Sequence, residues 1–296
     1  MTGVVKQMLE YIAFRICVVF FSILPWCAVY KISQAMAWLL RRVIKYRLPM
    51  LHDHIHSCFP EYTQVEKKHL IRSIYNQYTD VICENMKSFS MSADKVLKHV
   101  HFENRQLLKQ TLDQYPSCLI IASHFCNWEW GGVMALLFPK QINCIYKPVH
   151  NRYINRYILS LRRRWDTVLL STREFPKMLA RRSRKSHLSE VSQGFVLLSD
   201  QNPVSNQASI EILFLNRPTR FLVMPEKMAK RFNAPMIYAQ MTRSSRGQYR
   251  VRFLPLEGES HKEGDLTRMA AKYLEHQILE DPSSWLWLHN RWKVRH

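Results

Sequence analysis

Two short apolar runs constrain the fold of this chain more than any other feature of its sequence. Residues 117–122 read SCLIIA and residues 195–199 read FVLLS. Successive side chains of a strand point to opposite faces of a sheet, so a strand that is apolar at consecutive positions is buried on both faces. Such strands are typical of the centre of a parallel sheet that helices cover on both sides. We therefore expect both runs at the centre of an α/β fold.

Strand-like and helix-like segments alternate over most of the chain. The further strands that we expect lie at 142–146, 167–170, 235–241 and 249–254, and the helices near 128–138, 152–164, 174–182, 222–232 and 265–280. Alternation of this kind predicts the α/β class, with a mostly parallel central sheet flanked by helices. We expect the main domain at 47–296, with a helical lead-in to about residue 110 and the α/β body after it.

The lead-in contains one well-marked helix start. Thr63 and Glu66 have the spacing of a capping box, in which each side chain binds the backbone N–H of the other residue. Apolar residues at intervals of three and four follow it. This pattern predicts a helix from residue 63 to about Lys87.

The first 46 residues are predicted to attach the protein to a membrane. Residues 16–30 carry no charge, and residues 35–46 combine Trp38 with Arg41, Arg42 and Lys45. The uncharged run is short for a spanning helix, which needs about 20 residues, whereas the second segment is typical of an amphipathic helix in the bilayer interface. We therefore expect a membrane anchor, either spanning or interfacial, and the basic residues favour the cytoplasmic side. A helical hairpin packed on the core is the alternative.

Charge and residue counts exclude several classes of protein. The chain has 43 Lys and Arg against 23 Asp and Glu, and its net charge of +20 predicts an acidic partner. With only 7 glycines among 296 residues, it has neither the glycine motif of a dinucleotide-binding fold nor that of a P-loop. The G-x-S-x-G and H-E-x-x-H motifs are also absent. The 7 cysteines, none in C-x-x-C spacing, are expected as free thiols in a reducing compartment.

The clearest candidate for chemistry is the segment SHFCNWEW at 123–130, which follows the first apolar strand. Loops at the carboxyl ends of such strands are where α/β folds place reactive groups. The carboxylate of Glu129 can turn back to one imidazole nitrogen of His124, which would leave the other nitrogen as a general base. The spacing alone is common by chance, so a histidine at a helix end near an unrelated glutamate is the alternative.

This segment resembles the H-x-x-x-x-[DE] motif of the lysophospholipid and glycerolipid acyltransferase superfamily. From about residue 10 to 294 the chain resembles one branch of it, the bacterial lipid A biosynthesis acyltransferases of the lauroyl or myristoyl type. The matching pieces, in chain order, are Cys58-Phe-Pro-Glu61, Glu84-x-x-Lys87, His124-Phe-Cys-Asn-Trp-Glu129, Tyr146-Lys-Pro148, Asp200-Gln-Asn-Pro203, Phe214-Leu-Asn216 with Thr219, Glu226-Lys-Met-Ala229 and Trp285-Leu-Trp-Leu-His-Asn-Arg-Trp-Lys293. The order of the pieces and the terminal block are quite specific to this family.

The resemblance implies a glycerolipid acyltransferase-like fold and an O-acyltransferase activity. A fatty acyl thioester on acyl carrier protein, or on coenzyme A, would pass its chain to a hydroxyl group of a phosphorylated glycolipid, the lipid A precursor. His124 would act as the general base and Glu129 would orient it. The protein would work at the bacterial inner membrane with its active site on the cytoplasmic side. The reaction needs neither a metal ion nor another cofactor.

The same resemblance, together with position, marks a set of substrate-binding candidates. These are Asn127, Lys147, Arg164, Asp200, Gln201, His289 and Arg291. For Lys147 and Arg164 the alternative is an ordinary solvated surface, and for Asp200 a structural turn. His289 and Arg291 belong either to the wall of the site or to C-terminal packing, and packing is favoured for Trp292. The basic residues Arg181, Arg182, Arg184 and Lys185 either touch lipid headgroups or are simply solvated.

Three other interpretations remain open. The same chemistry can serve another acceptor, a lysophospholipid or an aminolipid. A basic protein without activity, which binds membranes or nucleic acid, is a different class, but no recognisable RNA- or DNA-binding module is present and we expect no nucleic-acid partner. His52 and His56 have a spacing that suits a metal ion on a helix, although a plain helix is the favoured interpretation. Cys126 is disfavoured as a nucleophile.

Overall fold

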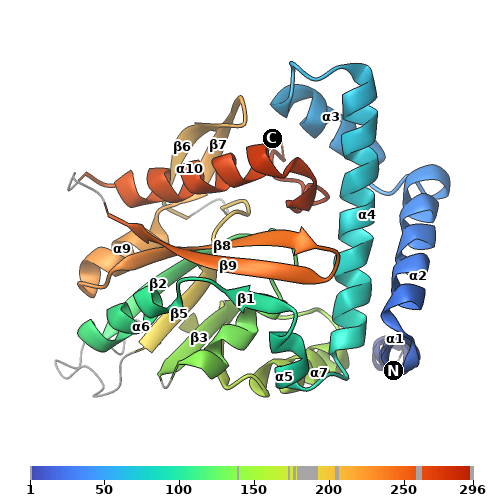
Figure 1. The fold of residues 1–296 in the computed structure, drawn as a ribbon, viewed down its shortest axis with the longest axis horizontal. Helices are drawn as coiled ribbons and strands as arrows, with labels where there is room; N and C mark the ends of the chain where they lie inside the picture. The colour runs from blue at the N-terminus through green and yellow to red at the C-terminus, as the bar shows by residue number, and fades with distance from the viewer. Residues whose placement is uncertain are drawn as a thin grey trace.

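Seven strands form one sheet in the computed structural model, which describes residues 2–138, 140–172, 174–175, 178, 193–203, 207–257 and 262–293. Their order across the sheet is β1-β9-β8-β2-β5-β3-β4 (Figure 1). The strands are β1 (Val100–Phe102), β2 (Ser117–Ala122), β3 (Gln141–Tyr146), β4 (Thr167–Ser171), β5 (Gln193–Leu198), β8 (Met236–Ser245) and β9 (Gln248–Leu256). All six strands that the sequence predicts are present.

The sheet is mostly parallel, as predicted. Strands β8, β2, β5, β3 and β4 run in one direction, and β9 returns antiparallel to β8 through a tight hairpin. The short β1 pairs with β9 at the edge. Strand β2 lies between β8 and β5 and is buried at five of its six positions, which explains its apolar sequence. Because β2 and β5 are parallel neighbours, the loops that follow them emerge side by side.

Helices cover both faces of the sheet and one of its ends (Figure 1). They are α3 (Leu48–Cys58), α4 (Gln64–Ser88), α5 (Ala93–Leu97), α6 (Arg105–Gln114), α7 (Arg152–Arg163), α9 (Met224–Arg231), α10 (Asp265–Glu280) and the single 3₁₀ turn η3 (Pro282–Ser284). The predicted capping box starts α4, where Thr63 Oγ1 accepts from Glu66 N at 3.3 Å and Thr63 N donates to Glu66 Oε2 at 2.7 Å. The lead-in is less uniformly helical than predicted, because β1 interrupts it.

Two predicted features of the body change in the structure. The helix expected at 128–138 is the 3₁₀ helix η2 (Trp130–Leu137). Its two glycines, Gly131 and Gly132, disfavour an α-helix, and a Cβ on Gly132 would lie only 2.9 Å from the Trp165 ring. A hairpin of β6 (Ser209–Phe214) and β7 (Arg217–Leu222) forms a second small sheet that the sequence does not predict. The helix expected at 174–182 lies mostly outside the described residues.

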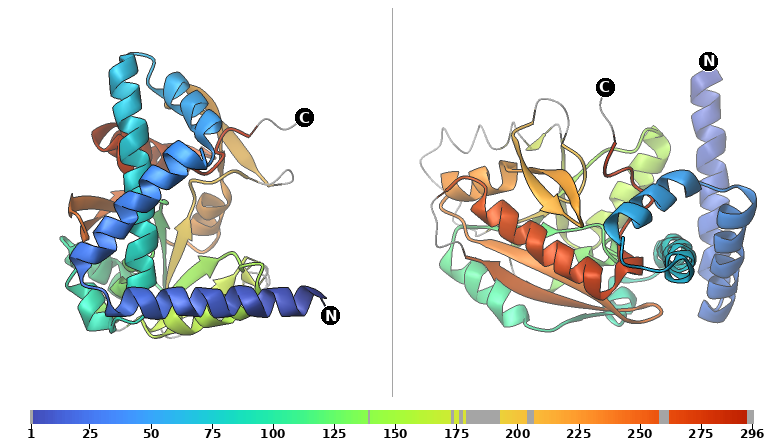
Figure 2. Two further views of the ribbon diagram at one scale, coloured as in Figure 1. Left: turned by 90° about the vertical axis from the view of Figure 1, so that its right-hand side faces the viewer. Right: turned by 90° about the horizontal axis from the view of Figure 1, so that it is seen from above.

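Three consecutive segments form the N-terminus. They are α1 (Thr2–Ile23), α2 (Trp26–Trp38) and the π-helix η1 (Leu39–Val43). The break between α1 and α2 falls at Pro25, because proline disfavours the continuation of a helix. Helix α1 lies beside α7 (Figure 2), with the Tyr11 and Tyr153 ring centroids 6.0 Å apart. Among the described helices, none combines the length and the apolar character needed to cross a bilayer.

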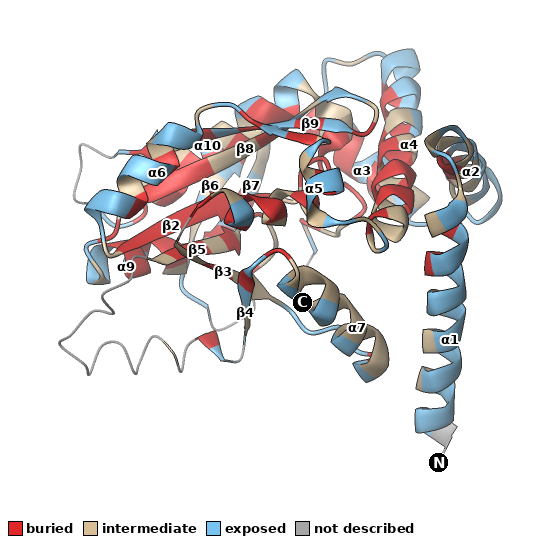
Figure 3. Ribbon diagram, turned by 60° about the horizontal axis from the view of Figure 1, so that its bottom comes forward, coloured by how far each residue is buried: buried red, intermediate tan, exposed pale blue. Residues whose placement is uncertain are grey.

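Most of α1 is exposed (Figure 3), and many of the exposed side chains of the N-terminal segments are apolar. On α1 one narrow stripe, including Tyr11, Phe14 and Val18, faces the rest of the protein. The other apolar side chains of α1 and several around η1 face outward. The exposed ones are Val4, Val5, Met8, Leu9, Ile12, Ile16, Val19, Phe20, Ile23, Trp38, Leu39, Val43, Ile44 and Tyr46.

Candidate active site

His124 lies in a loop that connects the buried strand β2 to η2. The C-terminal segment holds this loop, residues 123–129, by backbone hydrogen bonds: Leu286 N donates to His124 O at 3.1 Å, and Cys126 N donates to Ser284 O at 2.8 Å. Cys126 itself has a left-handed backbone with φ of 52°. We call residues 123–129 the catalytic loop, because they carry His124, the predicted general base. The terminal tryptophan-rich block of the sequence therefore packs beside this loop and holds it in place.

Asp200 binds the imidazole of His124 directly. Its Oδ1 lies 2.7 Å from His124 Nδ1, and its Oδ2 accepts from His124 N at 3.0 Å and from Trp285 Nε1 at 2.9 Å. Asp200 follows β5, whose neighbour in the sheet is β2. The loops that follow these two neighbouring strands therefore meet at His124 and Asp200.

The charges of this pair follow from its surroundings. Burial alone would raise the pKa of Asp200, but the charge and hydrogen bond of His124 and the Trp285 N–H outweigh it and lower that pKa to about 2. Burial alone would lower the pKa of His124, yet the attraction of Asp200 and the charge of Glu129 raise it above its ordinary 6.5. An ionised Asp200 only accepts hydrogen bonds, so Nδ1 carries the proton in the neutral imidazole. The lone pair then lies on Nε2, which is 3.1 Å from Gln201 Nε2.

Glu129 has a different partner from the one that the spacing predicts. Its two carboxylate oxygens accept from Arg162 of α7, one of them from Nε at 3.1 Å and the other from Nη2. In the described part of the chain no hydrogen bond joins Glu129 to the imidazole. The predicted direct contact between Glu129 and His124 is therefore wrong, because the 3₁₀ turn directs Glu129 toward α7 while Asp200 already occupies the imidazole edge.

Two cavities share Trp128, Glu129 and Arg162 in their linings, and His124 lines the larger of them. The larger, of about 600 Å³, contacts His124, Glu129, Lys147, Arg162 and Gln201 at the carboxyl edge of the sheet. It continues over an apolar surface made by Met134, Cys144, Trp165, Leu169, Val196 and Met241.

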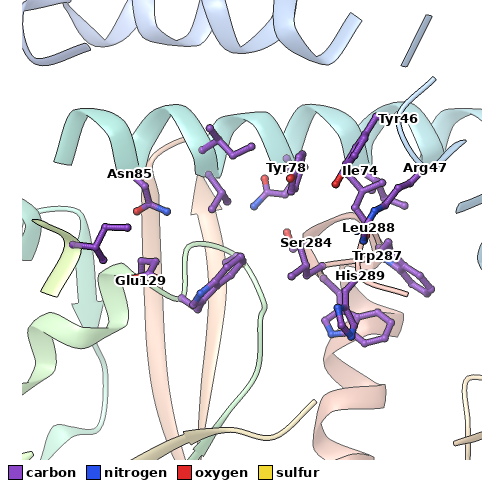
Figure 4. Close-up of a pocket in the computed structure, with 18 of the residues that line it drawn as sticks. Tyr46, Arg47, Ile74, Tyr78, Asn85, Glu129, Ser284, Trp287, Leu288 and His289 are labelled. Atoms are coloured by element: carbon purple, nitrogen blue, oxygen red, sulfur yellow. The ribbon is translucent and has the colours of Figure 1, made fainter. Parts of the chain in front are cut away.

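The smaller cavity, of about 380 Å³, lies between α4 and the C-terminal segment (Figure 4). Its lining includes Arg47, Tyr78, Val81, Phe89, Leu288 and His289. Trp128, Glu129 and Arg162 line both cavities, so the ion pair of Glu129 and Arg162 stands where the two spaces join.

The structure separates the predicted substrate-binding residues into two groups. Lys147 and Gln201 line the larger cavity and His289 the smaller one, while Asp200 binds His124. The other three bind protein groups instead of facing a cavity. Asn127 donates to Glu84 Oε2 at 2.9 Å; Arg164 donates to the carbonyls of Ser88 at 2.6 Å and Phe89 at 3.1 Å; and Arg291 donates to Asn202 Oδ1 at 2.7 Å and to Arg220 O at 2.6 Å.

Each of these three placements has a simple physical reason, and substrate contacts of the three residues stay predictions. Arg164 lies just past the end of α7, where it binds the last carbonyls of α4, whereas Arg162 one half-turn earlier faces Glu129. Asn127 and Arg291 are buried, and their side chains are used inside the protein. Sequence reasoning missed Arg162 and Trp285 as site residues, although Arg162 lies in the helix expected near 152–164 and Trp285 in the terminal block.

The minor candidates are consistent with structural roles. Among the described residues no group of three His, Cys, Asp or Glu side chains gathers to hold a metal ion, and the buried ring of His54 packs on Trp292 with the ring centroids 5.0 Å apart.

Trp292 donates to Thr219 Oγ1 at 2.7 Å, which fits the predicted packing role. Burial raises the pKa of the Cys126 thiol, so that it stays protonated and unreactive. Arg181, Arg182, Arg184 and Lys185 lie outside the described residues.

Comparison with known proteins shows the family of the chain. The family model described as bacterial lipid A biosynthesis acyltransferase matches residues 5–294. The chain is 21% identical to the lipid A biosynthesis palmitoleoyltransferase of Escherichia coli K12, over 92% of this chain and 87% of that protein. It is 20% identical over the same shares to the lipid A biosynthesis lauroyltransferase of the same organism. The chain therefore belongs to the bacterial lipid A biosynthesis acyltransferases, and it is an acyltransferase.

Proposed function

We propose that this acyltransferase moves a fatty acyl chain from a thioester to a hydroxyl group of a lipid A precursor, with His124 as the general base. The observation that carries the proposal is the ion pair of His124 and Asp200, which leaves Nε2 of the imidazole as the basic atom in a residue that lines the larger cavity. Family membership supports the acyl transfer and the lipid A precursor as acceptor. The thioester carrier, the base and the membrane attachment are our inferences.

The chemistry requires one general base and one general acid, and His124 serves as both in turn. Nε2 removes the proton of the acceptor hydroxyl while its oxygen attacks the carbonyl carbon of the thioester. The carbon–sulfur bond then breaks, and the imidazolium returns the same proton to the leaving thiolate. The products are the new ester and a free thiol. Asp200 stabilises the imidazolium and fixes its tautomer, a role that the sequence alone assigns to Glu129.

The two cavities suit the two substrates. The apolar floor of the larger cavity fits the hydrocarbon chain of the donor, and Lys147 and Gln201 border its mouth. The smaller cavity carries Arg47 and also His289, whose buried Nε2 lacks a hydrogen-bond partner among the described residues. A guanidinium group and an imidazole nitrogen without a partner in the described part of the chain suit the phosphate and sugar groups of the acceptor. Arg162 and Glu129 then face the reacting atoms from between the two.

The donor that we propose is acyl carrier protein rather than coenzyme A. The net charge of +20 favours encounters with an acidic protein and with a phosphorylated acceptor alike. Long-range attraction of this kind acts mainly on the association rate and weakens as salt is added. Acyl-coenzyme A, which is also anionic, is the second candidate for the donor. Parallel reactions with the two donors distinguish them.

A mixed-micelle acyl-transfer assay tests the proposal. We expect the full-length protein to form a new ester on a tetra-acylated lipid A precursor when supplied with a saturated acyl chain on acyl carrier protein, as detected by mass spectrometry of the lipid. Parallel reactions replace the donor by acyl-coenzyme A and the acceptor by a lysophospholipid. Ester formation only on the lysophospholipid would overturn the acceptor assignment, and transfer only from coenzyme A would overturn the donor assignment.

Membrane attachment is proposed through residues 1–46, which lie at the inner membrane and keep the active site on the cytoplasmic side. Supporting this are the outward-facing apolar side chains of α1 and the adjacent Arg41, Arg42 and Lys45, which suit insertion into an anionic bilayer surface. The rest of α1 packs on α7 and α4, so the catalytic body would be held close to the lipid.

The double variant Leu9→Glu, Ile16→Glu is expected to bind vesicles of anionic lipid at least about tenfold more weakly than wild type. Each substitution removes a large apolar side chain worth roughly 1.5–3 kcal/mol when buried in lipid, and adds a charge. Co-flotation with the vesicles in a density gradient measures the effect. Leu279→Glu, at a 53% exposed position of α10, is the matched control. Equal flotation of the double variant and the control would place the membrane contact elsewhere.

A further inference from the structure

One buried carboxylate joins the catalytic loop to two distant parts of the chain. Glu84 lies on α4 with no exposed surface. Its Oε2 accepts from Tyr249 OH of β9 at 2.6 Å and from Asn127 Nδ2 of the catalytic loop at 2.9 Å, and its Oε1 accepts from Tyr30 OH of α2 at 3.1 Å. Burial raises the pKa of Glu84, while the donors Tyr249 and Asn127 oppose that effect. Three donors around one carboxylate fix its position from three sides.

Asn127 passes this constraint on to the catalytic residues. It stands between His124 and Glu129 in the chain, and it is fully buried. Its backbone carbonyl accepts the N–H of Trp130 at 3.0 Å, the bond that begins η2. Because Glu84 holds the side chain of Asn127, it also fixes where η2 starts. The start of η2 in turn sets the direction of the Glu129 side chain. No contact of Glu84 or Asn127 with either cavity is present among the described residues, so both act through other groups.

One turn along α4, Lys87 holds the end of the exposed N-terminal helix. Its ammonium group donates to the carbonyls of Leu24 at 2.5 Å, Ser22 at 3.3 Å and Phe21 at 3.5 Å. These carbonyls belong to the last turn of α1 and to the break before α2, which together we call the α1–α2 corner (residues 21–26). Lys87 thereby neutralises the negative end of α1 and fixes the angle at which α1 leaves the body.

A second contact runs from the α1–α2 corner straight to η2. The ring of Trp26 lies 6.2 Å from that of Trp130, and 5.3 Å from the Lys87 ammonium group. Trp130 is fully buried and directly follows Glu129. The corner is thus tied to the catalytic loop twice, through α4 and by ring packing.

We propose that Glu84 is a positioning residue of the acyl-transfer site, which acts through Asn127, and that Glu84 and Lys87 together couple the α1–α2 corner to the catalytic loop. This inference rests on the proposed function, because it assigns a role at the same site. The segment that we expect to contact the membrane then does more than anchor the enzyme, since its seating on the body decides how well the loop is ordered.

A reciprocal exchange of charge and amide tests the first part. Asn127→Asp places two carboxylates against each other and is expected to lower kcat about 10- to 100-fold while the KM for the donor changes little, because misplaced catalytic groups slow the chemical step. Glu84→Gln added to Asn127→Asp restores one carboxylate and one amide across the same contact, with Tyr249 able to accept instead of donate. The double variant is expected to recover most of the lost kcat.

The exchange has a control against simple misfolding. The unfolding temperatures of wild type, Asn127→Asp, the double variant and Lys95→Met are measured beside the kinetics. Lys95 is exposed on α5, so Lys95→Met reports the effect of a charge change nearby. A double variant that regains the wild-type unfolding temperature but keeps the low kcat would overturn the positioning role. So would an Asn127→Asp protein with the kcat of wild type.

Hydrogen exchange tests the coupling without relying on activity. Lys87→Met removes three hydrogen bonds from the α1–α2 corner and is expected to raise amide exchange in peptides that cover 123–132, while peptides of β5 and β8 stay unchanged; Lys87→Arg, which keeps the charge and donors, should restore protection. Unchanged exchange at 123–132 would overturn the coupling even in an active enzyme. If the wild type fails to transfer acyl chains but the exchange rises, the proposed function falls and the coupling stands.

Discussion

Replacing His124 with alanine should lower kcat about 10²- to 10⁴-fold, the range expected for loss of a general base. Without the imidazole the acceptor hydroxyl loses its base, and the nearby carboxylate of Glu129 is already held in an ion pair with Arg162. The cavity walls remain, so the KM values for donor and acceptor should change by less than about threefold. Steady-state transfer in mixed micelles, with both substrates varied, measures the separation of kcat from KM.

The substitution also removes the partner of a buried carboxylate, so its stability must be followed. Asp200 keeps its bonds from the His124 backbone N–H and from Trp285, which leaves its charge partly compensated. His276→Ala, at an exposed position of α10, is the control for loss of a histidine. Equal activity of His124→Ala and wild type, in proteins of similar unfolding temperature, would show that the base is another group.

The parts of the fold that could be predicted from the sequence are those with strongly buried strands. The runs SCLIIA and FVLLS are central strands because only a two-sided buried strand is apolar at every position. The hairpin of β6 and β7 lacked such a signal, since both strands are partly exposed and Pro218 lies in the second of them. The segment of η2 was expected as an α-helix because its sequence is apolar. Gly132 can pack against the Trp165 ring only because it has no side chain.

The site was predicted in part for a different reason. The sequence placed His124 and Asp200 each after a strand, yet strand order in the sheet is not written in the sequence. Without knowing that β2 and β5 are neighbours, the carboxylate nearest in the chain, Glu129, was the natural partner for the imidazole. The same gap affects Arg162 and Arg164, whose roles depend on how α7 is rotated against η2 and α4.

Replacing Asp200 with asparagine should lower kcat about 10³- to 10⁴-fold, although it exchanges a single oxygen for an NH₂ group. Oδ2 accepts from two N–H groups, so the amide oxygen must take its place and the amide nitrogen must face Nδ1 of His124. Nδ1 then has to accept, and the proton moves to Nε2, where the lone pair is needed. In the Ser-His-Asp template the same exchange costs about 10⁴ in kcat by this change of tautomer.

The pH profile separates this role of Asp200 from that of Glu129. The raised pKa of His124 puts the acid limb of kcat/KM above pH 6.5 in wild type, because the base works only when neutral and is protonated at lower pH. Asp200→Asn removes the strongest influence that raises this pKa, so its acid limb should move to lower pH. Glu129→Gln leaves the Asp200 hydrogen bond in place and should move the limb less. The reverse order of the two shifts would make Glu129 the group that orients the imidazole.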